Sequence, residues 1–164
     1  NNTLLLEQLG WNGFSIDTSE KFTKKWKESD RKNLMIQQDA ISLDYLKLID
    51  EHLKTDNVDY LQIDLDESIS SFEVLKKIPF YDVQFAVITY EHDHYIDASR
   101  KGRQKSRDLL ESHCYVLVAG NISPDDKSPF EDWWVHPNLV DMGIVNDLVN
   151  NTKDILNIKD YILQ

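Results

Sequence analysis

Three stretches in the middle of the chain decide the fold: VDYLQIDL at residues 58–65, SSFEVLKKI at residues 70–78 and FAVITY at residues 85–90. The first and third are short, apolar and rich in β-branched and aromatic residues, which is typical of strands. The second has helical spacing, and Ser70 and Glu73 form a pattern that predicts a capped helix start. A strand–helix–strand order predicts two parallel strands joined by a crossover helix.

The same alternation extends along most of the chain. We expect further helices at residues 3–9, 19–29, 42–53 and 98–112, and further strands at residues 13–17, 34–38, 115–119 and 130–135. This order predicts an α/β fold of Rossmann-like type, with a mostly parallel sheet and helices on both faces. The last two strands have no helix between them, so we expect an antiparallel pair at one edge. From about residue 138 the tail is expected to be helical.

Composition limits the class of protein. The 164 residues include 18 Lys and Arg against 29 Asp and Glu, a formal net charge of −11, and 41% are hydrophobic. This is a globular composition, and the length favours one domain. The acidic balance argues against a nucleic-acid partner held by general electrostatics, and no apolar run is long enough for a membrane span. A single cysteine, Cys114, is compatible with a reducing, cytoplasmic location.

Acidic residues follow the predicted strands, at the edge where α/β sheets bind ligands. Asp17 ends the strand at 13–17, and Asp39 and Ala40 follow the strand at 34–38. A carboxylate in such a position can accept hydrogen bonds from the hydroxyls of a ribose. Both aspartates have an alternative role as caps of the following helix, for which Ser42 competes with Asp39.

Two richer clusters follow the next two strands. Asp64 begins the cluster at residues 64–67, and Glu91 and His92 belong to the cluster at residues 91–94. Carboxylates with an imidazole can hold a divalent metal or act as a general base. Solvated charges at loop ends are the alternative. Asp64, Glu91 and His92 are therefore candidates for catalysis and for metal ligation.

Cations and two tryptophans suggest contacts to a substrate. Residues 100–107 carry five cations in eight positions, so Arg103 and Arg107 are candidates for holding an anionic substrate, with a solvated helix face as the alternative. Asp93, in the preceding loop, is a further candidate contact. Trp133 and Trp134 should point to opposite faces of a strand, one into the core and one toward a substrate mouth, to which we assign Trp134.

Several of these segments together resemble the FkbM-type S-adenosylmethionine-dependent methyltransferases. The segments, in the order and spacing of that family over about residues 1–140, are NNTLLLEQLGWNGFSID (1–17), DYLQIDLD (59–66), FAVITYEHD (85–93), SRDLLESHCYVLVAGNI (106–122) and FEDWWVHP (130–137). The resemblance implies a class I methyltransferase fold and methyl transfer, most naturally to an oxygen of a small or sugar-like substrate. It also implies that the sequence begins after the family's first strand and glycine-rich loop, so that one N-terminally incomplete domain spans residues 1–164.

The resemblance further implies which residues would hold the cofactor. Asp17 matches the acid that binds the ribose, and Asp39 with Ala40 matches the turn that contacts the adenine. Asp64 matches the acid beside the transferred methyl group. Asn2 and Thr3 lie where the first helix meets the cofactor pocket; these two are therefore included among the cofactor-binding candidates.

Two other functions remain open on the sequence. Asp64 and Asp66 form an Asp-x-Asp after an apolar strand, a pattern that holds Mn²⁺ in nucleotide-sugar glycosyltransferases. A non-catalytic module with a methyltransferase-like fold is the other alternative. For methyl transfer, Asp64 with Glu91 or His92 can act as a direct base or can hold a divalent metal. The sequence does not specify the acceptor, nor whether the chain forms a homo-oligomer.

Overall fold

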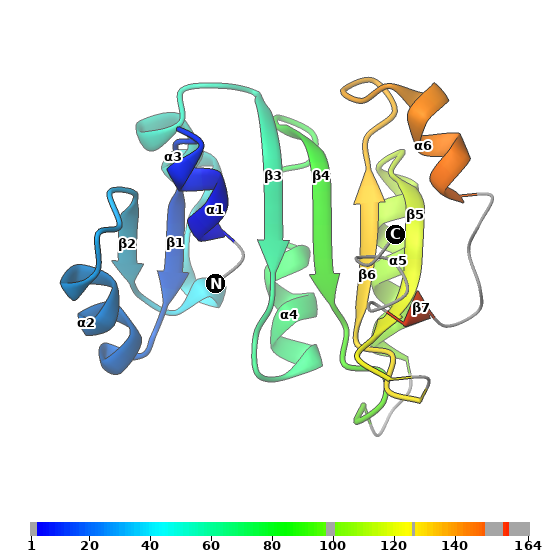
Figure 1. Cartoon of the computed structure of the whole chain (residues 1–164), viewed down its shortest axis with the longest axis horizontal. Helices are drawn as coiled ribbons and strands as arrows, with labels where there is room; N and C mark the ends of the chain where they lie inside the picture. The colour runs from blue at the N-terminus through cyan, green and yellow to red at the C-terminus, as the bar shows by residue number, and fades with distance from the viewer. Residues whose placement is uncertain (1–2, 98–100, 126, 150–155, 158–164) are drawn as a thin grey trace. The chain divides into compact units, whose positions relative to one another are not determined.

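The computed structural model describes residues 3–97, 101–125, 127–149 and 156–157, and Figure 1 shows its helices and strands. The chain divides into two compact units, residues 1–55 and residues 56–164. Within the described residues, no helix is both long enough and apolar enough to cross a membrane.

The first unit is built on two parallel strands. Its elements are α1 (Thr3–Gln8), β1 (Phe14–Asp17), α2 (Glu20–Glu28), β2 (Leu34–Gln37), a 3-10 turn (Ala40–Ser42) and α3 (Tyr45–His52). Strands β1 and β2 pair in parallel, with Asp17 opposite Gln37. The carboxyl ends of both strands therefore lie at one edge, as the strand–helix–strand order predicts.

A buried ion pair joins α1 to the loop between α2 and β2. Arg31 Nε donates to Glu7 Oε2 at 2.6 Å, and both side chains are at most 7% exposed. The Arg31 guanidinium also lies 3.6 Å from the centroid of the Trp26 ring, on α2. Backbone N–H groups of Lys32 and Asn33 donate to the other oxygen of Glu7. These contacts fix the short helix α1 against the loop between α2 and β2.

The start of α3 differs from the prediction. Asp44, not Ser42, caps the helix, and its Oδ1 accepts from the Lys47 N–H at 3.1 Å. Ser42 ends the 3-10 turn, where its hydroxyl donates to the Asp39 carbonyl at 2.7 Å. The prediction of a Ser42 cap is wrong because this extra turn precedes the helix.

The second unit holds a mixed five-stranded sheet. Its elements are β3 (Asn57–Ile63), α4 (Ser68–Leu75), β4 (Gln84–Glu91), α5 (Gly102–Ser112), β5 (Val116–Ser123), β6 (Glu131–Val135), α6 (Met142–Val149) and β7 (Leu156–Asn157). The strand order is β3-β4-β6-β5-β7. Strand β3 is parallel to β4 and β5 to β7, whereas β6 is antiparallel to both β4 and β5. The predicted α/β class is thus confirmed.

The predicted antiparallel pair exists but does not lie at an edge of the sheet. Strand β6 lies between β4 and β5 in Figure 1 and pairs with both. Both edges of β6 are therefore hydrogen-bonded, which suits a strand with almost no exposed residue. The sequence predicts the β5–β6 turn but not the second partner of β6.

Helices cover both faces of this sheet, as expected. Alternation along β6 places Asp132 and Trp134 on one face, where Asp132 contacts Arg107 of α5. Val135 is on the other face and packs with Val145 of α6. Helix α4 begins at Ser68, so Ser70 lies inside the helix and the predicted capping pattern at its start is wrong.

Candidate functional site

Two aspartates lie at the carboxyl edge of the first unit. Asp17 Oδ1 accepts from the Ser19 N–H at 2.7 Å, and Asp39 Oδ1 accepts from the Ile41 N–H at 2.9 Å. Asp39 thereby caps the 3-10 turn, whereas the cap of α2 is Ser19, so the capping alternative for Asp17 is wrong. Among the described residues, each carboxylate uses only one oxygen in this way, so the second oxygen can still accept from a ligand.

The turn that carries Ala40 is fixed by a hydrogen bond from α3. The hydroxyl of Tyr45, a buried residue, donates to the Ala40 carbonyl at 2.8 Å, and burial together with the Asp39 charge raises the pKa of Tyr45 to about 12. Thr3 lies on α1, where its hydroxyl accepts from Arg31 at 2.8 Å. The structure thus gives Thr3 a contact within its own unit, while Asn2 lies outside the described residues.

Carboxyl groups gather at the corresponding edge of the second unit. Asp64 follows β3, Glu91 ends β4, and Glu131 begins β6 directly opposite Glu91. Burial raises the pKa of Glu91 to about 9, helped by a hydrogen bond to Asp64 and by the charges of Asp64 and Asp93. Glu91 therefore keeps its proton at neutral pH, while the neighbouring Asp64 is exposed.

The same face carries residues that sequence reasoning missed. Glu131 is only 8% exposed, and burial raises its pKa although the Trp133 indole N–H donates to its carboxylate. The Tyr60 and Thr89 hydroxyls lie 2.8 Å apart. Alternation along residues 130–135 was the available signal, because it puts Glu131 and Trp133 on the same face.

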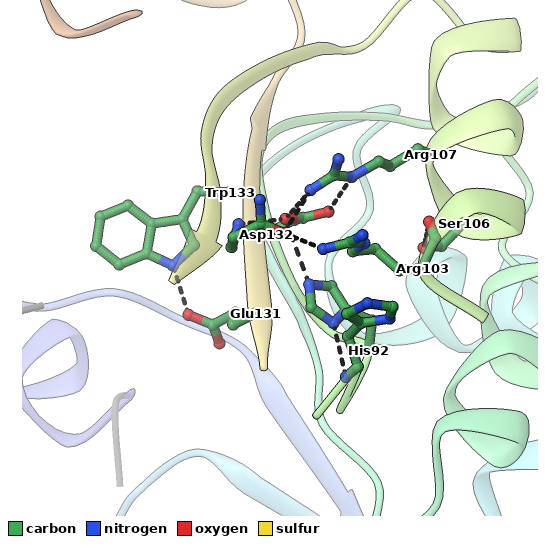
Figure 2. A network of polar contacts seen from close by, with 9 residues as sticks. His92, Arg103, Ser106, Arg107, Glu131, Asp132 and Trp133 are labelled. Atoms are coloured by element: carbon green, nitrogen blue, oxygen red, sulfur yellow. Dashed lines mark hydrogen bonds and ion pairs between the residues drawn. The ribbon is translucent and has the colours of Figure 1, made fainter. Parts of the chain in front are cut away.

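His92 is held in a buried network, shown in Figure 2. Its side chain is fully buried, and its Nδ1 accepts from the His94 N–H at 3.1 Å. Its Nε2 lies 3.4 Å from Asp132 Oδ1. Arg107 binds the same carboxylate with two nitrogens, at 2.8 Å to Oδ2 and 2.9 Å to Oδ1. Burial acts to raise the pKa of Asp132, but the contacts with His92 and Arg107 outweigh it and lower that pKa.

This network corrects three predictions. His92 is neither an accessible base nor a metal ligand, because one ring nitrogen accepts from the His94 N–H and the other faces Asp132 in the interior. Arg107 has a structural role in place of the predicted contact with a substrate, because its Nε and Nη2 groups both donate to the Asp132 carboxylate. Trp134 does not line a substrate mouth, because it is fully buried in the core; Trp133 is the partly exposed indole.

Asp93 is a buried neighbour of the carboxyl groups of Asp64 and Glu91, and it does not lie on an open surface. It is 5% exposed, and burial raises its pKa although its contacts with Glu91 and His92 act in the other direction. Across the described ranges, no set of three or more His, Cys, Asp or Glu side chains is arranged to hold a metal ion. Asp64 and Glu91 therefore lie together as a carboxyl pair and not as part of a preformed metal centre.

A bulge in β5 completes the network. The register of β5 against β6 shifts between Ala119 and Ile122, and Asn121 has a positive φ of 59°. This conformation lets the Asn121 N–H donate to Asp132 Oδ1 at 2.8 Å while its side-chain oxygen accepts from Arg107 at 3.0 Å and from Arg103 at 2.5 Å. Bulges of this kind reorient side chains at sheet ends.

Comparison with known proteins adds no relative: no family model, no curated protein and no solved structure matches the chain.

Proposed function

We propose that the chain acts as an S-adenosylmethionine-dependent methyltransferase that methylates a hydroxyl of a small or sugar-like molecule. The observation that carries the proposal is the parallel β1–β2 pair, which brings Asp17 and Asp39 to one carboxyl edge. Among the residues that the structure describes, each carboxylate accepts from a backbone N–H with one oxygen, which leaves the second oxygen available to a ligand. This is the edge where α/β sheets bind nucleotides.

The donor set fits an adenosyl group. A carboxylate after a strand can accept from both ribose hydroxyls, a role that suits Asp17. Asp39 and Ala40 form the turn that would contact the adenine. S-adenosylmethionine, when bound, supplies an electrophilic methyl group. The mixed sheet with helices on both faces is compatible with the class I methyltransferase fold that the resemblance implies.

Proton removal is the part of the chemistry that the second unit supports. The acceptor hydroxyl must be aligned with the methyl group and must lose its proton. Asp64 is the exposed member of the carboxyl pair, and Glu91 keeps the shared proton because burial and the neighbouring charges raise its pKa. We therefore assign the base to Asp64, with Glu91 reducing the negative charge of the pair. This direct base needs no metal ion.

Calorimetry with S-adenosylhomocysteine tests the proposal. We expect binding by the chain and at least a tenfold loss in Asp17→Asn, a variant whose amide oxygen can still accept from the Ser19 N–H. Asp30→Asn, an exposed aspartate before β2, is the matched control and should bind as the wild type does. Equal binding by Asp17→Asn and the wild type would remove the ribose contact on which the proposal depends.

Two further titrations cover the alternatives. Binding of a UDP-sugar with Mn²⁺, lost in Asp66→Asn, would instead favour the glycosyltransferase. Binding of neither ligand would favour a non-catalytic module. The cytoplasmic location stays a prediction that depends on the cysteine content.

A further inference from the structure

Two arginines lie on one face of α5. Arg103 and Arg107 are four residues apart, so their side chains lie side by side on the helix. Figure 2 shows both side chains reaching from α5 toward Asp132, near the start of β6. Both guanidinium groups donate to a single atom, the side-chain oxygen of Asn121, at 2.5 Å from Arg103 and 3.0 Å from Arg107.

One carboxylate, that of Asp132, acts on both arginines, but only Arg107 forms an ion pair with it. Arg107 binds both oxygens of Asp132, which also accepts from the Asn121 N–H. In the part of the chain that the structure describes, Arg103 forms no ion pair, and its hydrogen-bond acceptor is a neutral amide. Burial and the charge of Arg107 lower the pKa of Arg103, and the charge of Asp132, which acts in the other direction, does not outweigh them.

The surrounding polar groups do not supply the missing negative charge. The His92 ring accepts at Nδ1, so the proton of a neutral ring is on Nε2, which faces Asp132. The Ser106 hydroxyl donates to the Arg103 carbonyl at 2.8 Å. Glu91 and Glu131 pair with one another across β4 and β6 one position beyond Asp132, so their side chains are on the opposite face of the sheet.

We propose that Arg103 binds a small oxyanion, with Asn121 and the Arg107–Asp132 pair holding its guanidinium in position. The planar guanidinium has five N–H donors in a fixed fork, which matches the oxygens of a phosphate or a carboxylate. Only one Arg103 hydrogen bond goes to a described residue. Arg103 lies at the carboxyl ends of β4 and β5, the edge at which sheets of this class bind ligands. The site does not depend on methyl transfer.

Titration with inorganic phosphate tests the site in the whole chain. The ionic strength is kept constant with NaCl, and the Nε–Hε signal of Arg103 is followed by NMR. We expect a saturable shift with a dissociation constant on the order of 1 mM. A shift that stays linear up to tens of millimolar, as expected from general ionic attraction, would overturn the proposal without any variant.

Three variants separate the site from the charge of the helix. Arg103→Gln should weaken phosphate binding at least tenfold, and Arg103→Lys should weaken it less because the charge remains while the planar fork is lost. Lys105→Gln makes the same change of charge two residues away, at an exposed position, and should leave binding unchanged. Equal weakening by Lys105→Gln and Arg103→Gln would contradict a site at Arg103.

A parallel titration with sodium acetate identifies the class of oxyanion. Tighter binding of phosphate would assign the site to a phosphate group, and tighter binding of acetate to a carboxylate. Phosphate tests the site at Arg103, and S-adenosylhomocysteine tests the site at Asp17 and Asp39. Failure of the phosphate titration therefore does not contradict the methyltransferase proposal. Failure of S-adenosylhomocysteine binding does not contradict the anion site.

Discussion

At the scale of single residues, Asp132 has the largest set of contacts in the described network. Its carboxylate is fully buried and accepts from Arg107 and Asn121, and it faces His92. A buried carboxylate is costly unless its charge is paired and its oxygens are hydrogen-bonded. Both conditions are met here, so removal of the carboxylate charge should cost more than the contacts themselves contribute.

We therefore expect Asp132→Asn to lower the free energy of unfolding by about 3–5 kcal/mol. The amide would place an N–H group against the Arg107 guanidinium, whose side chain is only 18% exposed and would lose its counter-charge. Urea denaturation measures the change. Asp108→Asn, at an exposed position of α5 where the carboxylate accepts from Gln104, should stay within about 0.5 kcal/mol of the wild type. A comparably small change in Asp132→Asn would contradict this account.

Glu91 should make the protein less stable as the pH rises, whereas a carboxylate that is ion-paired in the folded state makes a protein more stable as the pH rises. Its pKa is raised to about 9 in the folded chain, so between about pH 4.5 and pH 9 the folded state holds a proton that the unfolded state releases. The free energy of unfolding therefore falls as the pH rises through this window. Burial raises the pKa of Asp93 and of Glu131 as well, which adds to the same slope.

The measurement is urea unfolding at intervals between pH 5 and pH 9. Glu91→Gln should flatten the slope and should be more stable than the wild type at the alkaline end, because the glutamine never loses a proton. Glu111→Gln, at an exposed position of α5, should keep the wild-type slope. An unchanged slope in Glu91→Gln would mean that Glu91 is ionised at neutral pH, and the assignment of Asp64 as the base would lose its support.

The residue scale also shows which part of the candidate site the sequence could predict. The acids at strand ends follow from strand order alone, and Asp17, Asp39, Asp64 and Glu91 lie where that order puts them within their units. The partners of Asp132 could not be predicted, because Arg107 is 25 positions away and no local pattern links them. Alternation along the strand places Asp132 on the same face as Trp134. Because a buried charge needs a partner, this placement is the one signal in the sequence that Asp132 pairs with a cation.

At the scale of elements, the turn chemistry of β5 determines how α5 meets the sheet. Gly120 lies in the bulge, and a Cβ there would be 3.1 Å from Leu117 Cδ2 and 3.2 Å from Arg107 Nη2. Such contacts are tighter than normal packing, and Arg107 cannot move away without losing its two bonds to Asp132. The glycine is thus needed for close approach of α5 to β5.

Gly120→Ala should lower the free energy of unfolding by about 1–3 kcal/mol, the usual cost of an overpacked site. The matched control is Gly13→Ala, because a Cβ on Gly13 would meet nothing within 4 Å. Chemical denaturation of both variants measures the difference. Equal stability of the two alanine variants would contradict the claim that Gly120 is needed for the close approach of Arg107 to β5.

Helices and strands were predicted well because their signals are local. Apolar periodicity and the positions of glycine and proline are properties of short segments, and each predicted helix and strand before residue 138 has a counterpart in the structure. The place of β6 between β4 and β5 and the cap at Asp44 depend on pairing and on one extra turn. Neither is encoded in a periodic pattern, so the sequence alone could not supply them.

At the scale of the whole molecule, the excess of acidic groups should oppose folding. The formal net charge is −11, with 29 acidic and 18 basic residues. Repulsion among like charges destabilises the compact state, and salt screens it. Salt also weakens ion pairs, but the exposed pairs of this chain, such as Lys24–Glu28 at 3.8 Å, contribute little. The buried Arg107–Asp132 and Arg31–Glu7 pairs are shielded from solvent and should respond weakly.

The balance of these effects predicts that the urea midpoint rises when NaCl is increased from about 10 mM to about 500 mM, a change that shortens the screening length from about 30 Å to below 8 Å. The measurement is made at pH 7 and repeated near pH 4.8, the isoelectric point that the composition gives. Near that pH the net charge is small, so the effect of salt should largely disappear. A midpoint that falls with salt at pH 7 would mean that specific ion pairs, and not the overall repulsion, dominate the electrostatics of the fold.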